Sequence, residues 1–391
     1  MEENKNNPKG KGLVLNEEYK AVFNFSENGK NSSSFRPLIT LDSIGAKVNA
    51  ITPGELFWQY AKAGFLYPNK KRKLTPYIEL VEENWRKALM LGEEIFWIAT
   101  VSNQKSKSWA SICNWRTNLT GWVSQHLVSS GNAAYSLMLM LGTQVKFKKE
   151  ASSKPYGSLQ NWYRPTNKYA QKVFGFLAES VRKDAVDLEQ FQYYMADRKV
   201  ISTLFSEDIH VLKCSNKIQN GIVEFLRSKR GEIYLSAEEL LSGDIELLSL
   251  NEIYQKVGLE RKRYFWIAYE KANPMPCGVA IVYRAPVGLN FSMIENRCEI
   301  IVEDSLSETG ALNVCRALLK AACEKYNDFP APFMPLTSDL KLVPFLAKLG
   351  IHPVRSYNQF IWKENGFDDW YNSLWDLSEH SIQRWMRMHQ G

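Results

Sequence analysis

The chain has 391 residues, of which 45% are hydrophobic and 13% aromatic, and its formal net charge is +7. This length predicts two domains, and the apolar fraction is sufficient for a core in each. The moderate positive charge suits an anionic ligand such as a phosphate-bearing cofactor, but it is too small, and too mixed with acidic residues, to indicate nucleic-acid binding.

The cysteines and the apolar stretches predict the compartment. No CxxC pair or regular spacing links the six cysteines, which lie mostly in apolar stretches: Cys113, Cys214, Cys277, Cys298, Cys315 and Cys323. Such residues usually pack as small apolar side chains, which argues against a disulfide framework and a structural zinc ion. The polar N-terminus lacks a signal-peptide pattern, and no apolar run approaches the roughly 20 residues of a membrane helix. We therefore expect a cytoplasmic protein with no metal and no membrane segment.

The N-terminal region predicts a mobile lead-in followed by two capped helices. Residues 1–34 are rich in Asn, Lys, Gly and Ser, with one short strand expected around 21–25. The pattern Thr-Pro-Gly-Glu at 52–55 predicts a capping box, and Thr-Pro at 75–76 predicts a second helix start. The basic run at 70–73 between them is interpreted as a solvated loop, with a phosphate or polyanion contact as the functional alternative.

Alternating and apolar runs predict the rest of the first half. Strands are expected at 95–101, 109–115 and 122–128, then a turn at 129–133, a helix over 134–141, a strand over 145–149, an extended segment at 161–165 and a helix over 167–180. A helix is also expected over 188–195, inside the mixed, charged stretch that should contain the domain boundary.

The second half repeats this order. Phe96-Trp97-Ile98-Ala99 recurs as Phe265-Trp266-Ile267-Ala268. The predicted elements are a strand at 209–212, a helix at 218–226, a helical region at 236–257 with Ser236 and Glu239 as a capping box, strands at 264–270 and 278–283, and a strand–helix–helix unit at 297–351. The recurrence in one register predicts a duplicated α/β domain.

Two segments of the second copy carry a family resemblance. The strand at 298–302 runs through Val302–Leu312 into a helix, and a later segment, Thr337–Ile351, ends in Lys-Leu-Gly-Ile. These segments resemble the GNAT (Gcn5-related N-acetyltransferase) superfamily, whose loop reads V-x-P-x-x-R/Q-G-x-G-x-G/A and whose later segment reads N-x-x-A-x-x-x-Y-x-x-x-G-F. Gly310 takes the place of the central glycine, whereas Ser307 replaces the Arg or Gln and Phe345 the tyrosine.

The resemblance implies a fold and a domain division. The fold would be α/β, with two tandem GNAT-like domains, each a mixed, mostly antiparallel sheet flanked by helices. The expected division is a lead-in at 1–34, an N-terminal GNAT-like domain at 35–200 and a C-terminal one at 201–391.

The resemblance also implies a cofactor, acetyl-CoA or another acyl-CoA. Backbone N–H groups at a helix start cradle a pyrophosphate, and small residues let it approach. In the first copy these residues are Val128, Ser129, Ser130, Gly131, Asn132 and Ala133. The loop of the second copy carries Glu303, Asp304 and Glu308, which oppose an anion. We therefore expect the working site in the first copy, with an ordinary strand-to-helix turn as the alternative.

Three residues of the first copy are candidates for proton transfer. His126, on the strand before the loop, has the reach and the pKa range of a general base, and Tyr135 and Tyr169 are candidate donors to the leaving thiolate. The alternative for each is a core role. In the second copy Glu299 is a candidate base, interpreted instead as a solvent-facing strand residue.

The segment at 161–169 alternates aromatic with polar and basic residues directly before a helix. Such a set can stack a planar ring and hold a phosphate or a carboxylate, and the candidates are Trp162, Tyr163, Arg164 and Asn167. The alternative is a strand edge with Thr166 capping the helix.

Two functions follow from these features. The first is an acyl-CoA-dependent N-acyltransferase acting on a small-molecule or peptide amine. The alternative is a non-catalytic GNAT-like binding or sensor protein that holds a nucleotide-like or protein ligand. The Trp-bearing C-terminal segment at 370–388 predicts an amphipathic helix that packs or mediates self-association.

Overall fold

The computed structural model describes residues 38–389 apart from 152–156, 207, 215–217, 219 and 272. The predicted lead-in at 1–34 and its short strand at 21–25 lie outside the described residues. All six cysteines are free thiols. Within the described ranges, no helix combines the length and the apolar character that crossing a membrane requires.

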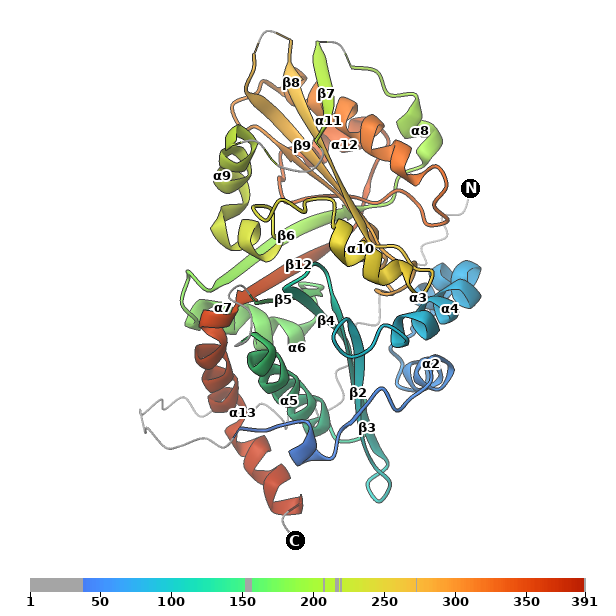
Figure 1. The fold of residues 1–391 in the computed structure, drawn as a ribbon, viewed down its shortest axis with the longest axis vertical. Helices are drawn as coiled ribbons and strands as arrows, with labels where there is room; N and C mark the ends of the chain where they lie inside the picture. Colours follow the sequence, from blue (N-terminus) through green and yellow to red (C-terminus); the bar gives the residue numbers. More distant parts are fainter. Residues whose placement is uncertain are drawn as a thin grey trace, which may run out of the picture.

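Twelve described strands form one continuous sheet in the order β1-β2-β3-β4-β5-β12-β6-β11-β10-β9-β8-β7 (Figure 1). Neighbours are antiparallel except for the pairs β4–β5 and β10–β11. The strands are β1 (Lys47–Val48), β2 (Phe96–Asn103), β3 (Ser108–Arg116), β4 (Gly121–Ser130), β5 (Ser158–Tyr163), β6 (Val186–Tyr194), β7 (Ile209–Cys214), β8 (Lys262–Glu270), β9 (Pro276–Arg284), β10 (Cys298–Val302), β11 (Pro335–Thr337) and β12 (Pro353–Lys363).

The last strand of the chain, β12, joins the two halves. It pairs antiparallel with β5 on one side and with β6 on the other, so residues 353–363 lie between two strands that precede residue 200. β11 in turn pairs with β6. The domain division at residue 200 stays a prediction, and strand pairing crosses it.

Helices cover both faces of the sheet. One core packs α2, α3, α4, α10, α11 and α12 against it, a second packs α5, α7 and α13, and a third packs α9. The helices are α2 (Pro53–Lys62), α3 (Pro68–Leu74), α4 (Ile78–Leu89), α5 (Ala134–Ala151), α6 (Lys168–Ala170), α7 (Leu177–Ser180), α8 (Arg198–Ser202), α9 (Asn220–Ala237), α10 (Leu248–Gln255), α11 (Glu308–Cys323), α12 (Leu342–Lys348) and α13 (Phe367–His389).

The predicted α/β class and repeated order are confirmed. The order β2-β3-β4-α5-β5 recurs as β8-β9-β10-α11-β11, with the two Phe-Trp-Ile-Ala segments in β2 and β8. The predicted capping box is present at α2, where Thr52 Oγ1 accepts from the Glu55 N–H and the Glu55 carboxylate accepts from the Thr52 N–H. Trp370 and Trp375 of α13 are buried in the core beside α5, which fits the packing alternative for this segment.

Two predicted elements were wrong because burial overrode a local pattern. The strand expected at 145–149 belongs to α5, where Val145 and Phe147 are buried and Phe147 packs on Trp97 and Trp122. The helix expected at 188–195 is instead the strand β6, held between β12 and β11. In both cases the short run of residues fits the period of a strand as well as that of a helix, and contacts with distant parts of the chain determine which of the two forms.

Two local interpretations also change. The basic run at 70–73 is not a loop but the last part of α3, which begins at Pro68. Ser236 lies inside α9 and caps nothing there, while Glu239 has a φ of 52°. The Glu239 carboxylate accepts the backbone N–H groups of Leu119 and Thr120, so it ties α9 to the turn between β3 and β4.

A buried polar network crosses the junction of the halves. Arg230 of α9 donates to Glu299 of β10 and, at 2.9 Å, to Gln359 of β12, and its Nε lies 2.6 Å from Glu189 of β6. Gln359 Nε2 donates to Gln160 of β5 at 3.0 Å. Because Arg230 and Glu299 are almost fully buried, each charge depends on the other for its compensation.

We therefore expect Arg230→Met to lower the free energy of unfolding by about 3–5 kcal/mol, because it leaves the Glu299 carboxylate buried and unpaired. Arg227→Met removes only exposed ion pairs from the same helix and should cost less than about 1 kcal/mol. Chemical denaturation of both variants measures these changes. An equal decrease in the free energy of unfolding in the two variants would contradict the stabilising role of the network.

Candidate functional site

The parallel pair β4–β5 opens along its length. The ladder covers only Gly121–Val123 against Ser158–Gln160, although β4 continues to Ser130. Beyond Val123, therefore, the edge of β4 that faces β5 has no strand partner in the described sheet. We call this region the β4–β5 opening.

A β-bulge lies on β4 at the opening. Cys113 of β3 pairs with Gln125 and Ser111 pairs with Val128, so two β4 residues, His126 and Leu127, stand opposite one β3 residue. His126 has a φ of 55°, a left-handed conformation that is uncommon for a residue other than glycine. A bulge frees backbone groups from the ladder and is frequent beside functional sites.

The corresponding strand of the second half lacks this feature. β10 pairs with β9 without a register shift, and its parallel ladder with β11 joins Cys298 to Pro335 and Glu299 to Leu336. The two halves therefore share the splayed parallel pair, and the described structure places a bulge only on the β4 side.

The loop after β4 is compact. Gly131 has a φ of 76°, and a Cβ there would lie 2.8 Å from Ser108 Oγ, so glycine is required on both counts. The Asn132 N–H donates to Ser108 Oγ at 3.0 Å, and the Ala134 N–H donates to Asn132 Oδ1 at 2.9 Å. Two further amides are occupied, since the Tyr135 N–H donates to the Asn132 carbonyl and the Ser136 N–H to the Ala133 carbonyl. The turn predicted at 129–133 begins later than expected, because Ser129 and Ser130 are the last residues of β4, where both are half-buried.

In the second-half loop, lysines neutralise the acidic residues. Lys229 pairs with Glu303 and Asp304, and Lys348 pairs with Glu308. The hydrogen bond from Lys229 is the main reason that the pKa of Asp304 is lowered. The loop thus places carboxylates beside the start of α11, where they oppose a bound anion.

His126 lies in an aromatic cluster. Its ring is buried and stacks on Trp85 at 5.5 Å, and Phe291 lies 4.5 Å away. The Phe291 N–H donates to His126 Nε2 at 3.3 Å, so the lone pair that a general base needs is occupied. Burial, and then the charge of Lys70, lowers the pKa of His126 well below its usual value, which keeps the ring neutral.

Phe291 belongs to a buried loop from the second half, residues 285–296, which covers this side of β4. Asn84 of α4 donates to the Val287 carbonyl at 2.9 Å, and Trp85 Nε1 donates to the Gly288 carbonyl at 2.8 Å. The second half thus helps to build the surroundings of the first-half strand.

The other predicted site residues are divided between the core and the surface. Trp162 is buried on the face that carries α3, and Tyr163 is buried on the other face with Phe174. Tyr135 is buried in the core of α5, and Tyr169 is half-buried at the start of α6. Asn167, not Thr166, caps α6, where its side chain accepts from the Ala170 N–H at 3.3 Å.

Arg164, the remaining predicted ligand residue, lies in a group of cations. Tyr67, directly before α3, accepts hydrogen bonds at its hydroxyl from Arg164 and from Arg355 of β12. Lys70 of α3 is 8% exposed, and its Nζ lies 3.5 Å from the centre of the Phe65 ring. We call Lys70, Lys73, Arg164 and Arg355 the cation cluster. The structure thus brings together the basic run at 70–73 and the segment at 161–169, each of which is a candidate for anion contacts.

Burial, with Arg164 and Arg355 nearby, lowers the pKa of Lys70 to about 7. Lys73, beside Arg355 and Arg72, also has a lowered pKa, mainly through burial. Among the described residues no carboxylate lies within ion-pair distance of Lys70, Lys73, Arg164 or Arg355, since no salt bridge includes them.

Glu299 does not face solvent as interpreted from the sequence. It is 1% exposed, it pairs with Arg230, and Tyr234 donates to it at 3.2 Å. The carboxylate is committed to the network between the halves. Within the described ranges, no group of His, Cys, Asp and Glu side chains is arranged to hold a metal ion.

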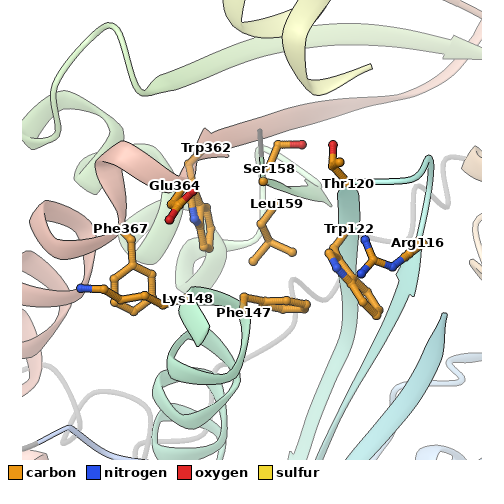
Figure 2. Close-up of a pocket in the computed structure, with 11 residues that line it drawn as sticks. Arg116, Thr120, Trp122, Phe147, Lys148, Ser158, Leu159, Trp362, Glu364 and Phe367 are labelled. Atoms are coloured by element: carbon orange, nitrogen blue, oxygen red, sulfur yellow. The ribbon is translucent and has the colours of Figure 1, made fainter. Parts of the chain in front are cut away.

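A hollow at the closed end of the β4–β5 ladder offers less to a ligand. Figure 2 shows its aromatic lining, with Trp122 and Arg116 facing Trp362 and Phe367. Arg116 already donates to the carbonyls of Glu94 and Leu119, and Lys148 pairs with Asp368. We therefore place the candidate site at the other end of the ladder, at the opening.

Comparisons with known proteins support the topology alone. No protein-family model and no curated protein matches the chain. Similar solved structures include a tandem GNAT protein from the clavulanic acid biosynthesis pathway, at 9% identity, covering 82% of this chain and 98% of that one with a TM-score of 0.37. A second is a GCN5-related N-acetyltransferase from Sphaerobacter thermophilus, at 11% identity, covering 69% of this chain and 81% of that one with a TM-score of 0.34. A third is a GCN5-related N-acetyltransferase-like protein from Streptococcus suis, at 13% identity, covering 72% of this chain and 99% of that one with a TM-score of 0.33.

These descriptions name the GNAT superfamily, which two segments of the second copy resemble in sequence. Identities and TM-scores this low carry no argument about activity.

We expect Lys70→Met to stabilise the protein, because it removes a buried charge that no carboxylate compensates. With a folded pKa of about 7 and an unfolded pKa near about 10.4, the destabilisation is complete below the folded pKa and fades as pH rises toward the unfolded one. The gain should be on the order of 4 kcal/mol at about pH 6 and clearly smaller at about pH 9.

Chemical denaturation in buffers without phosphate or sulfate measures the gain in the free energy of unfolding at both pH values. Lys71→Met, an exposed neighbour on α3, is the control and should change stability little at either pH. A variant of Lys70 that is less stable than the wild type at the lower pH would contradict the account.

Proposed function

We propose that the protein is an acyl-CoA-dependent N-acyltransferase whose working site is the β4–β5 opening of the first half. The observation that supports this most strongly is the bulge at His126 and Leu127, placed where β4 leaves β5 and just before a glycine-containing loop into α5. Acyl transfer needs a donor for the developing oxyanion, and backbone N–H groups outside a ladder are available for this role.

In this proposal the acyl-CoA pyrophosphate lies on the loop of residues 128–133, the thioester reaches the opening, and the amine approaches from the face that carries α3. The amine attacks the thioester carbonyl, a C–N bond forms as the C–S bond breaks, and the net reaction moves the proton that the amine loses to the thiolate. Tyr169 is half-buried whereas Tyr135 is buried, and the Tyr169 hydroxyl, itself buried, has to become exposed before it can donate this proton. His126 would serve as base only after the Phe291 N–H leaves Nε2. Tyr135 is retained as a packing residue.

The second half suits this role less well. Its strand β10 is not bulged, and its loop carries three carboxylates that are paired with lysines. An acyl-CoA pyrophosphate there would displace lysines from their partners and leave negative charges beside it.

The alternative function is a non-catalytic binding protein with the same fold. Two observations favour it: the Asn132 N–H is occupied by Ser108, and His126 Nε2 is occupied by the Phe291 N–H. Both groups would otherwise be free to take part in cofactor binding or proton transfer.

Calorimetry with acetyl-CoA tests the location of the cofactor. We expect micromolar binding to the wild type and at least a tenfold loss in Ser130→Glu, which adds a negative charge to the first-half loop without backbone strain. Ser305→Glu makes the same change in the second-half loop and should leave the affinity unaltered.

Absence of binding to the wild type, or a loss confined to Ser305→Glu, would overturn the proposal. Release of free CoA thiol during incubation with amines then separates the two functions, because the non-catalytic alternative predicts no thiol release.

A further inference from the structure

The cation cluster is exceptional within this protein because its charges lack acidic partners. The four most buried arginines each have a carboxylate: Arg230 has Glu189 and Glu299, Arg261 has Glu295 at 2.8 Å, Arg263 has Glu238 at 3.2 Å, and Arg297 has Glu238 at 3.7 Å. In the described structure Arg164 and Arg355 donate instead to the Tyr67 hydroxyl, Arg355 donates also to the Tyr357 hydroxyl at 3.5 Å, and Lys70 and Arg164 lie over aromatic rings.

This arrangement costs stability unless an anion joins it. Lys70, at 8% exposed, is the most buried lysine of the described residues, and the charged groups that act on its ammonium are the cations Arg164 and Arg355. The ring of Phe65 compensates only part of the desolvation of its ammonium group. A buried cation with like-charged neighbours is the environment that binding sites for anions provide.

The cluster is also built from three separate parts of the chain. Lys70 comes from α3, Arg164 follows the last residue of β5, and Arg355 comes from β12, which the fold inserts beside β5. Trp162 and Tyr357, near the two arginines in sequence, pack in the core that α3 also joins, whereas α5 packs in the other core. The cluster therefore lies across the sheet from α5.

We propose that Lys70, Arg164 and Arg355 form an anion site that holds a dianionic group such as a phosphate monoester, with Lys73 as an outer charge. Two guanidinium groups that share one phenol oxygen can instead direct their N–H groups to the oxygens of one anion. That this anion belongs to the amine acceptor rests on the function proposed above. The proposal thus assigns a substrate class: small amines that also carry a phosphate.

The site should take up a proton as it binds. The charged and titratable groups around Lys70 are Arg164 after β5, Arg355 of β12, Lys73 and Tyr67 at α3, and neutral His126 of β4. An anion favours the ammonium form of Lys70, so affinity should rise as pH falls through about 7. Sulfate is the suitable probe, because its own charge does not change in this range.

The test is calorimetry with sulfate, inorganic phosphate and acetate on the full chain. We expect saturable binding of both dianions, weaker binding of acetate, and at least a tenfold loss in Arg164→Gln and in Arg355→Gln, since each removes a charge-assisted hydrogen bond. Lys71→Gln, on the exposed side of α3, is the matched control and should bind as the wild type does.

Lys70→Met separates binding from folding, because it should abolish sulfate binding while the variant unfolds at a higher temperature than the wild type without ligand. The site is refuted if the wild type does not bind sulfate saturably, or if Lys71→Gln loses as much affinity as the arginine variants. If sulfate binding depends on the two arginines but acetyl-CoA does not bind, the anion site is supported and the acyltransferase proposal is rejected.

Discussion

Insertion of β12 between β5 and β6 is the constraint on which the rest of the structure depends. It makes one sheet out of two halves, and the buried network of Arg230, Glu299 and Gln359 stabilises the junction through long-range contacts. The same strand carries Arg355 to the end of β5, beside Arg164. β12 therefore adds Arg355 to the candidate site of the first half, so the two halves are similar in topology but share one sheet.

The two halves differ in how they treat charge at equivalent places. The second half neutralises its loop carboxylates with lysines and its buried arginines with carboxylates, which leaves little capacity for an added anion. The first half keeps a bulge on β4 and leaves buried Lys70 with arginines for neighbours. The proposed anion site rests on this difference, because a bound anion would offset the cost of the second arrangement.

Local patterns predicted much of the fold but little of the site. The strands around 95–128 and the capping box at Thr52 follow from short-range periodicity and capping, and both are confirmed. The helix expected at 188–195 was wrong because this run fits the period of a strand as well as that of a helix. Pairing with β12, some 165 residues later in the chain, makes it a strand. Arg164 was a candidate from composition, whereas Arg355 and the burial of Lys70 depend on strand register and helix docking, which no local signal encodes.

The central claim is that two ligand groups meet at the β4–β5 opening from opposite faces of the sheet. A crystal structure with CoA and sulfate tests it most directly. The account predicts the CoA pyrophosphate within hydrogen-bond distance of backbone N–H groups at 128–133, and sulfate between Arg164 and Arg355. CoA bound at the loop of residues 303–308, or an arginine pair still closed on Tyr67 with sulfate elsewhere, would contradict it.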